Sequence, residues 1–267
     1  MDTKLKDKVV IVTGGASGIG EAAVRGFIDE GAITVFIDKN KDKGQRLSDE
    51  FLINSRTLNT PHRFIYGDLT NEDFCKQAIE KTIKDYGRLD VLVNNAGKND
   101  WCDIDDTTPV QFRESLERNF IHYYTMSHFS WPYLKETRGN IVFVGSKVAL
   151  VGEGHTTAYA SAKGACIGLT RELAAKSAKE NLGIRVNCVI PAIVNTPLQN
   201  LKEKYGSTEQ GLKEIGRPVP FERRPTESVE IANEIIFLAS NHLSAHTTGQ
   251  LRFPDGGYLH IDRDITH

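Results

Sequence analysis

The sequence predicts a single α/β domain built on a doubly wound parallel sheet of seven strands, with helices on both faces of the sheet. Short apolar runs rich in β-branched residues alternate with longer amphipathic stretches along the whole chain, which is the pattern of successive strand–helix–strand units. No internal repeat, low-complexity tract or Pro/Gly-rich linker divides the 267 residues, so we expect residues 1–267 to form one domain.

Seven short apolar runs are the expected strands, and they lie at residues 9–13, 34–38, 63–67, 91–94, 140–145, 185–190 and 250–253. Helices are expected in the amphipathic stretches at 19–30, 41–51, 71–86, 110–135, 157–180 and 226–240. The least regular stretch is 195–221, which contains three prolines and several glycines. A long irregular segment in a compact domain is often functional, so we interpret 195–221 as a substrate-binding loop that moves.

The charge balance is nearly neutral, with 33 basic and 35 acidic residues and no long run of either sign. This balance argues against binding to nucleic acid or to a membrane and favours a small-molecule partner. Residues 1–8 are charged, and no apolar run reaches membrane-spanning length, so we expect a cytoplasmic protein. The four cysteines have neither disulfide-framework nor metal-finger spacing, so we expect reduced thiols and no metal site.

A glycine-rich turn follows the first expected strand and reads Thr-Gly-Gly-Ala-Ser-Gly-Ile-Gly over residues 13–20. Such glycines allow a tight turn, close approach of the backbone to a pyrophosphate, and close packing of the next helix, whose N-terminus faces the phosphates. A turn of this kind can also join a strand to a helix without any ligand. The residues that would hold a dinucleotide here are Gly14, Ser17, Gly18, Ile19 and Gly20.

Asp38 closes the second expected strand, about twenty residues after the turn. A carboxylate at this position can accept hydrogen bonds from the adenosine ribose and repel the extra phosphate of NADP, which favours NAD as the cofactor. The neighbouring Lys39 could instead attract that phosphate, which leaves NADP as the less favoured alternative. Asp38 could also act as the cap of the next helix.

Two further segments follow strands, namely Asp68 and Leu69 after the third and Asn95, Ala96 and Gly97 after the fourth. Open α/β sheets bind ligands at the carboxyl ends of their strands. We therefore expect Asp68 to accept a hydrogen bond from the adenine amino group, and the small Ala96 and Gly97 to allow backbone contact with the cofactor. Read singly, either segment could equally be ordinary turn chemistry.

Tyr159 and Lys163 are one helical turn apart, so their side chains project from the same face of the expected helix at 157–180. An ordinary tyrosine, with a pKa of about 10, is a poor base at neutral pH, but a nearby ammonium stabilises its phenolate. Ser146 follows the fifth expected strand and could donate a hydrogen bond to a developing alkoxide. Taken alone, the pair could instead belong to an exposed helix with a solvated lysine.

The chain resembles the classical short-chain dehydrogenase/reductase family over nearly its whole length, through the glycine turn, Asn94-Asn95-Ala96-Gly97, Ser146, Tyr159-Ala160-Ser161-Ala162-Lys163 and Arg185-Val186-Asn187. The resemblance implies a Rossmann-type fold, a nicotinamide cofactor, and a catalytic set made of Asn119, Ser146, Tyr159 and Lys163. There are two local departures, Gly145 in place of the frequent serine and Pro191-Ala192 in place of Pro-Gly. Neither removes a side chain that the chemistry needs.

The resemblance also implies roles for individual residues. During oxidation Tyr159 would remove the substrate proton, Ser146 would hold the substrate oxygen, Lys163 would bind the nicotinamide ribose, and Asn119 would anchor a water that relays the proton. Pro191, Ile193 and Thr196 would lie near the nicotinamide, although Thr196 could otherwise be a helix cap. Family members usually assemble through the two long helices, so we expect a homotetramer or a homodimer.

The residues expected at the mouth of the site are Asn99, Trp101, Ser146, Lys147, Glu153 and His155. Most are polar, which favours a sugar or polyol substrate over a steroid or an acyl chain. The tail at 253–263 is similar to that of family members that oxidise sugars such as L-fucose at the anomeric carbon. Each of these residues could be an ordinary surface residue, and Lys147 and Glu153 could pair with each other. The alternative functions are a hydroxysteroid or 3-oxoacyl reductase of the same family and a non-catalytic nucleotide-sensing protein.

Overall fold

The central element of the computed structural model, which describes residues 2–58, 61–197 and 201–262, is a seven-stranded sheet. Its strand order is β3-β2-β1-β4-β5-β6-β9. Every neighbouring pair of these strands is parallel. The order runs in opposite directions on the two sides of the β1–β4 pair, so this pair is the switch point at which open sheets bind ligands. The predicted doubly wound sheet is confirmed.

The strands of this sheet lie at the seven predicted places, with their ends shifted by a residue or two. They are β1 (Val9–Thr13), β2 (Ile33–Asp38), β3 (His62–Tyr66), β4 (Val91–Asn94), β5 (Asn140–Val144), β6 (Arg185–Val189) and β9 (Leu251–Arg252). All residues of β1, β4, β5 and β6 are buried. Such continuous burial is expected of a parallel sheet that helices cover on both faces.

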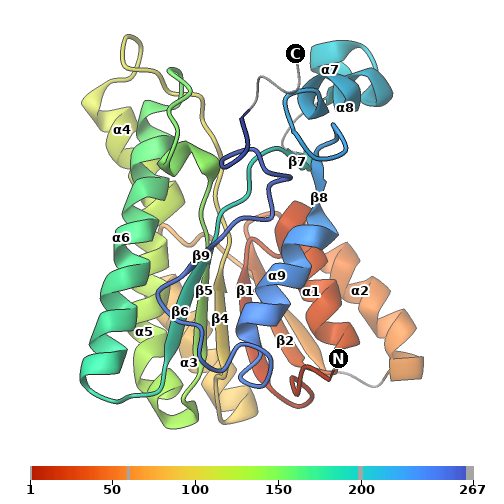
Figure 1. Cartoon of the computed structure of the whole chain (residues 1–267). Coiled ribbons are helices and arrows are strands. Elements are labelled where there is room, and N and C mark those ends of the chain that lie inside the picture. The colour runs from red at the N-terminus through yellow and green to blue at the C-terminus, as the bar shows by residue number, and fades with distance from the viewer. Residues whose placement is uncertain (1, 59–60, 198–200, 263–267) are drawn as a thin grey trace.

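Two helical layers cover the sheet (Figure 1). One core cluster joins the sheet to α1 (Gly18–Asp29), α2 (Lys41–Leu58) and α9 (Ser228–Ala239). The other joins it to α3 (Glu72–Tyr86), α5 (His122–Thr137) and α6 (Thr157–Lys179). The helices therefore cover both faces of the sheet, and the loops lie at its carboxyl edge. No helix in the described part of the chain is long and apolar enough to span a membrane.

The helix predicted at 110–135 is observed, but one stretch within it has a different geometry. It consists of α4 (Pro109–Leu116), a π-helical turn at Glu117–Ile121, and then α5. Thr108 caps α4 with a reciprocal pair of contacts to Gln111. π-Helical turns are rare and occur mainly at functional sites, and this turn contains the buried Asn119.

The segment at 195–221, which we expected to be an irregular substrate-binding loop, includes two short helices. It contains α7 (Leu201–Tyr205) and α8 (Thr208–Gly216), with Ser207 capping α8; residues 198–200 lie outside the described part. A small parallel pair, β7 (Val194–Asn195) and β8 (Thr226–Glu227), brackets the segment. α7 has five residues and α8 has nine, with Gly211 inside α8, so both are too short to show a clear helical period in the sequence. Figure 1 shows them at the carboxyl edge of the sheet.

Candidate active site

A cavity of about 670 Å³ opens at the carboxyl edge of the sheet, beside the switch between β1 and β4. Every predicted site residue lies in the described part of the chain, and all but Gly20, Asn119 and His155 line this cavity. Residues that are more than 180 positions apart in sequence, such as Gly14 and Thr196, thus face one space. Among the described residues, no cluster of His, Cys, Asp and Glu side chains could hold a metal ion.

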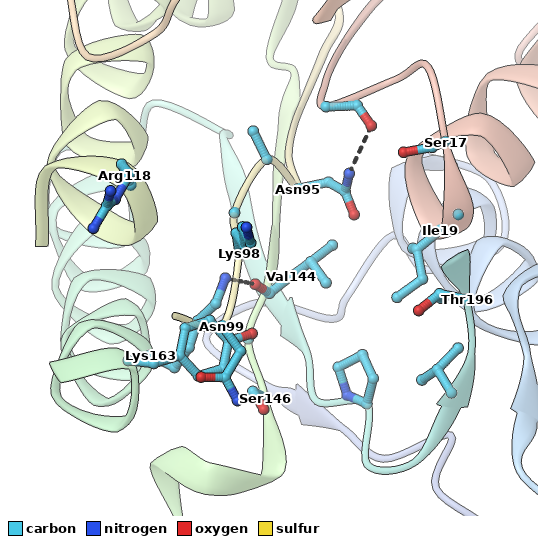
Figure 2. Close-up of a pocket in the computed structure, with 18 of the residues that line it drawn as sticks. Ser17, Ile19, Asn95, Lys98, Asn99, Arg118, Val144, Ser146, Lys163 and Thr196 are labelled. Atoms are coloured by element: carbon cyan, nitrogen blue, oxygen red, sulfur yellow. Dashed lines mark hydrogen bonds between the residues drawn. The ribbon is translucent and has the colours of Figure 1, made fainter. Parts of the chain in front are cut away.

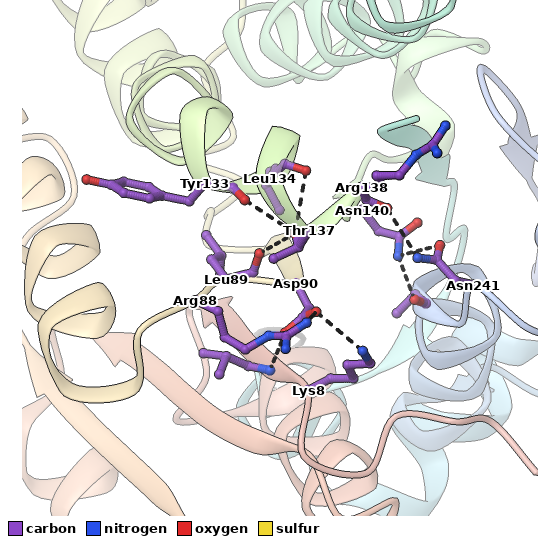
Figure 3. Close-up of polar contacts among 12 residues, drawn as sticks. Lys8, Arg88, Leu89, Asp90, Tyr133, Leu134, Thr137, Arg138, Asn140 and Asn241 are labelled. Carbon is purple, nitrogen blue, oxygen red and sulfur yellow. Dashed lines mark hydrogen bonds and ion pairs between the residues drawn. The ribbon is translucent and has the colours of Figure 1, made fainter. Parts of the chain in front are cut away.

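The glycine turn packs directly against the end of β4. Gly14 has a φ of +65°, and a Cβ atom placed on it would lie 2.8 Å from the Cα of Ala96. A Cβ on Gly20 would lie 2.0 Å from the carbonyl oxygen of Gly14, which explains why Gly20 supports the turn without lining the cavity. Asn95 fastens the two segments together, because its Nδ2 donates to the carbonyl oxygens of Thr13, at 2.9 Å, and Gly14 (Figure 2).

Asp38 lies at one end of the cavity, held by the backbone. Its Oδ2 accepts a hydrogen bond from Ala16 N at 3.0 Å, and its Oδ1 accepts one from Asn40 N at 2.9 Å. The start of α2 is capped by Asn40, whose Oδ1 accepts from Lys43 N, so Asp38 is not the helix cap that the sequence left open. Lys39 and Lys43 line the same cavity.

Asp68 follows β3 and faces the cavity near Asp38. Its Oδ1 accepts hydrogen bonds from the backbone N–H and the hydroxyl of Thr70, both at 3.0 Å. The backbone hydrogen bond from Thr70 is the main cause that lowers the pKa of Asp68, so its carboxylate is charged at neutral pH. This end of the cavity therefore carries two fixed negative charges, with Lys39 close enough to influence Asp68.

Tyr159 and Lys163 line the opposite part of the cavity. Lys163 is only 2% exposed, so the alternative of a solvated lysine on an exposed helix is wrong. Its ammonium lies 5.6 Å from the centre of the Tyr159 ring. It donates to the hydroxyl of Tyr123 at 3.0 Å and to the carbonyl oxygen of Val144 at 2.9 Å, the latter shown in Figure 2.

Lys163 is a charged ammonium despite its burial. Burial lowers the pKa of Lys163, whereas its electrostatic interactions with Tyr123, Tyr159 and Cys166 raise it, and the net direction is upward. Ser146 follows β5 with its Oγ 3.5 Å from Val148 N, and it lines the cavity with Tyr159 and Lys163. A hydroxyl, a phenol and an ammonium thus gather at one place.

Asn119 lies behind the cavity wall and does not face the cavity. It is fully buried, and its Oδ1 accepts from Lys98 N at 2.7 Å, while its Nδ2 donates to the carbonyl oxygen of Ser115 at 3.0 Å. A Cβ on Gly97 would lie 2.9 Å from that Oδ1, so Gly97 permits the contact. The Asn119 side chain therefore fastens the loop after β4 to the π-helical turn.

Ile193 and Thr196 line the cavity on the side of the glycine turn. A Cβ on Gly18 would lie 3.4 Å from Cγ2 of Thr196, so Thr196 lies close to the glycine turn. Figure 2 shows Thr196 and Ile19 across the cavity from Lys163 and Ser146. Pro191 lines the same wall. The two walls define a slot between the glycine turn and the Tyr159–Lys163 pair.

The mouth residues form two contacts of their own. Lys147 and Glu153 make an ion pair, as the sequence left open, yet both line the cavity; Lys147 also lies 4.8 Å from the centre of the Tyr258 ring. Tyr258 belongs to the tail at 253–263, of which residue 263 lies outside the described part. Trp101 is 55% exposed and stacks on the exposed ring of His155, with ring centres 5.3 Å apart.

The sequence reasoning missed Tyr123, His122, Lys98 and Arg118. Tyr123 contacts Lys163, and the other three line the cavity. A signal for Tyr123 was present, because it lies one helical turn after Asn119 and so shares its face. No sequence pattern marked the other three.

Known proteins resemble this chain across its whole length. A family model described as short chain dehydrogenase matches residues 8–206. An L-fucose dehydrogenase from Mus musculus is 36% identical over 240 residues, which cover 89% of this chain and 84% of that protein. A crystal structure of the Cj0485 dehydrogenase has a TM-score of 0.89 and 38% identity, covering 98% of each chain. The aldohexose dehydrogenase of Thermoplasma acidophilum has a TM-score of 0.84 and 33% identity, covering 97% of this chain and 96% of the other.

These similarities agree with the parallel sheet, the glycine turn at its switch point, and the hydroxyl, phenol and ammonium that meet across the cavity. The resemblance inferred from the motifs is therefore confirmed. The chain belongs to the short-chain dehydrogenase family, is an oxidoreductase, and lies near the sugar dehydrogenase branch of that family.

Proposed function

We propose that the protein catalyses the NAD-dependent oxidation of a sugar or polyol, with an aldose of the L-fucose type as the best-supported substrate. The observation that carries the proposal is the polar mouth, where the Lys147–Glu153 ion pair and the stacked Trp101 lie beside Ser146. The L-fucose and aldohexose dehydrogenases among its relatives support the same substrate class.

The described residues fit a nicotinamide dinucleotide. Gly14 carries no side chain where it packs against Ala96. A dinucleotide could therefore approach the backbone closely at the centre of the slot. Asp38 and Asp68 provide acceptors for ribose hydroxyls and an adenine amino group at one end. The carboxylate of Asp38 favours NAD because it would repel the additional phosphate of NADP, although Lys39 and Lys43 moderate that repulsion.

A nicotinamide cofactor held in this slot would supply the hydride acceptor for the substrate carbon. The buried charge of Lys163 stabilises Tyr159 as a phenolate, and this phenolate acts as the general base that takes the proton of the substrate hydroxyl and becomes a neutral phenol. Ser146 donates to the substrate oxygen and holds it against Tyr159. Asn119 keeps the loop after β4 in place, through the hydrogen bond from Lys98 N.

The mouth would select the substrate by hydrogen bonding. Lys147 keeps N–H donors, and the Glu153 carboxylate keeps acceptor capacity, after their mutual contact. An apolar alcohol would leave the remaining donors of Lys147 and acceptors of Glu153 unsatisfied, which costs binding free energy. Trp101 offers a flat face to a sugar ring.

A spectrophotometric panel tests the proposal. Aldoses, polyols, hydroxysteroids and acyl thioesters are each assayed with NAD(H) and NADP(H) at equal concentrations. We expect turnover of aldoses or polyols with NAD and little with the other classes. Turnover of hydroxysteroids or acyl thioesters alone would refute the substrate assignment, and a preference for NADP would refute the cofactor assignment.

A further inference from the structure

A buried tyrosine hydroxyl contacts the ammonium of Lys163. Tyr123, the second residue of α5, is fully buried. Its ring stacks on Phe143 of β5, with centres 5.8 Å apart, and meets the ring of His122 edge-on. A phenylalanine would fill this space equally well, so packing does not require the hydroxyl.

The hydroxyl is part of a closed set of three hydrogen bonds. Lys163 Nζ donates to Tyr123 Oη at 3.0 Å and to the Val144 carbonyl oxygen at 2.9 Å. Tyr123 Oη in turn donates to the same carbonyl oxygen at 3.2 Å. This arrangement needs a protonated phenol, and burial raises the pKa of Tyr123 well above its ordinary value. Tyr123 is therefore neutral.

Three N–H groups belong to the ammonium, and two of them are engaged in this set. The third remains for the cavity that Lys163 and Tyr159 line. Gly97 keeps space open beside the ammonium, since a Cβ there would lie 3.5 Å from Nζ. Two fixed N–H bonds determine the direction of the third, so the Tyr123 hydroxyl helps to aim it.

A neutral partner also preserves the charge of Lys163. The titratable groups that influence the ammonium are Tyr123 and His122 from α5, Tyr159 and Cys166 from α6, and Cys188 from β6. Burial raises the pKa of both cysteines and lowers that of His122 to about 4, so these groups are uncharged at neutral pH. An aspartate in place of Tyr123 would cancel the charge that favours the phenolate.

We propose that Tyr123 is a positioning residue, whose neutral hydroxyl holds the Lys163 ammonium in the orientation that Tyr159 and the cofactor require. This inference rests on the proposed roles of Lys163 and Tyr159. Tyr123 touches neither the substrate space nor the cofactor space, and it acts through Lys163.

The test is the Tyr123→Phe variant, with Tyr124→Phe as the matched control. Tyr124 is the next residue of α5, is 52% exposed, and does not line the cavity. In the pH profile of kcat/KM for oxidation, we expect Tyr123→Phe to move the midpoint of the acidic limb up by about one unit, with about a tenfold loss at neutral pH. Activity should approach the wild-type value at high pH, because Tyr159 itself is intact.

A binding measurement supplies a readout that does not depend on turnover. Titration of NADH by protein fluorescence should show a dissociation constant about fivefold higher for Tyr123→Phe than for Tyr124→Phe, since Lys163 is no longer aimed at the ribose. If Tyr123→Phe does not fold, 3-fluorotyrosine introduced at position 123 keeps the shape and weakens the acceptor. It should move the midpoint in the same direction by a smaller amount.

Tyr159→Phe and Lys163→Met separate the two proposals. If both lose activity while Tyr123→Phe matches Tyr124→Phe in midpoint and NADH affinity, the role of Tyr123 is refuted and the proposed function stands. If Tyr159→Phe retains wild-type turnover, the proposed chemistry fails, and the positioning role fails with it.

Discussion

Replacing Asp38 with alanine should shift the cofactor preference from NAD toward NADP. In the folded protein, Ala16 N and Asn40 N each donate one hydrogen bond to the carboxylate, which leaves lone pairs on both oxygens for a ribose diol. A hydrogen bond to a charged group contributes about 1.5–3 kcal/mol. Losing it should raise the KM for NAD roughly 10- to 150-fold, by conversion at 1.4 kcal/mol per tenfold. The KM for NADP should be lower than in the wild type, because the repelling carboxylate is lost while Lys39 and Lys43 remain.

The assay is kcat/KM for NAD and for NADP, with one substrate at saturation, for wild type, Asp38→Ala and Asp38→Asn. The Asp38→Asn variant keeps an acceptor for the backbone N–H groups but loses the charge. Its ratio of kcat/KM for NAD to kcat/KM for NADP should therefore lie between those of the wild type and Asp38→Ala. Melting temperatures show whether the turn, which loses two acceptors in the Ala variant, is still folded. An unchanged NAD/NADP ratio in a folded Asp38→Ala variant would show that Asp38 does not contact the ribose.

Three further outcomes are expected. Tyr159→Phe should lower kcat by roughly 10²- to 10⁴-fold with an unchanged melting temperature, because only the proton-transferring group is lost; comparable turnover would contradict its role as base. Arg185 donates to three backbone carbonyls and one amide oxygen, so Arg185→Met should lower the free energy of unfolding in denaturant by about 3 kcal/mol, whereas the exposed Arg171→Met should leave it nearly unchanged. Burial lowers the pKa of His122 to about 4, so the unfolded chain binds more protons between about pH 4 and 6.5 and stability falls as the pH decreases through that window, by roughly 3 kcal/mol in total. His122→Phe should remove this part of the pH dependence in denaturant titrations, and a wild-type slope in that variant would show that another group causes it.

The pattern of residues along the chain was enough to place the parallel sheet and most of the site. Strand runs such as 9–13 and 140–144 are almost entirely apolar, because a parallel sheet covered on both faces buries every side chain, and this signal is local. Gly14, Asp38 and Ser146 each follow a strand, and parallel strands end at one edge, so their convergence could be inferred without coordinates. The spacing of Tyr159 and Lys163 follows from the helical repeat alone.

The two helices within 195–221 could not be inferred in the same way. Helices of this length have too few turns to show a periodic pattern, and these two pack against each other, with Gly211 of α8 close to Leu201 and Tyr205 of α7. The π-helical turn that holds Asn119 has no sequence signature, since a single extra residue in a helix changes no local propensity. Neither feature therefore leaves a local pattern in the sequence.

The amino-acid sequence by itself determined the sheet, the glycine turn and the presence of a phenol beside an amine, because each of these depends on residues that are close together along the chain. Only the tertiary structure decided that Lys163 is buried, that Tyr123 holds it from another helix, and that Asn119 lies behind the cavity wall. The physical reason is that burial and hydrogen-bond partners are set by contacts between residues far apart in the sequence, such as the contact between α5 and α6 across 40 residues, and no local pattern records them.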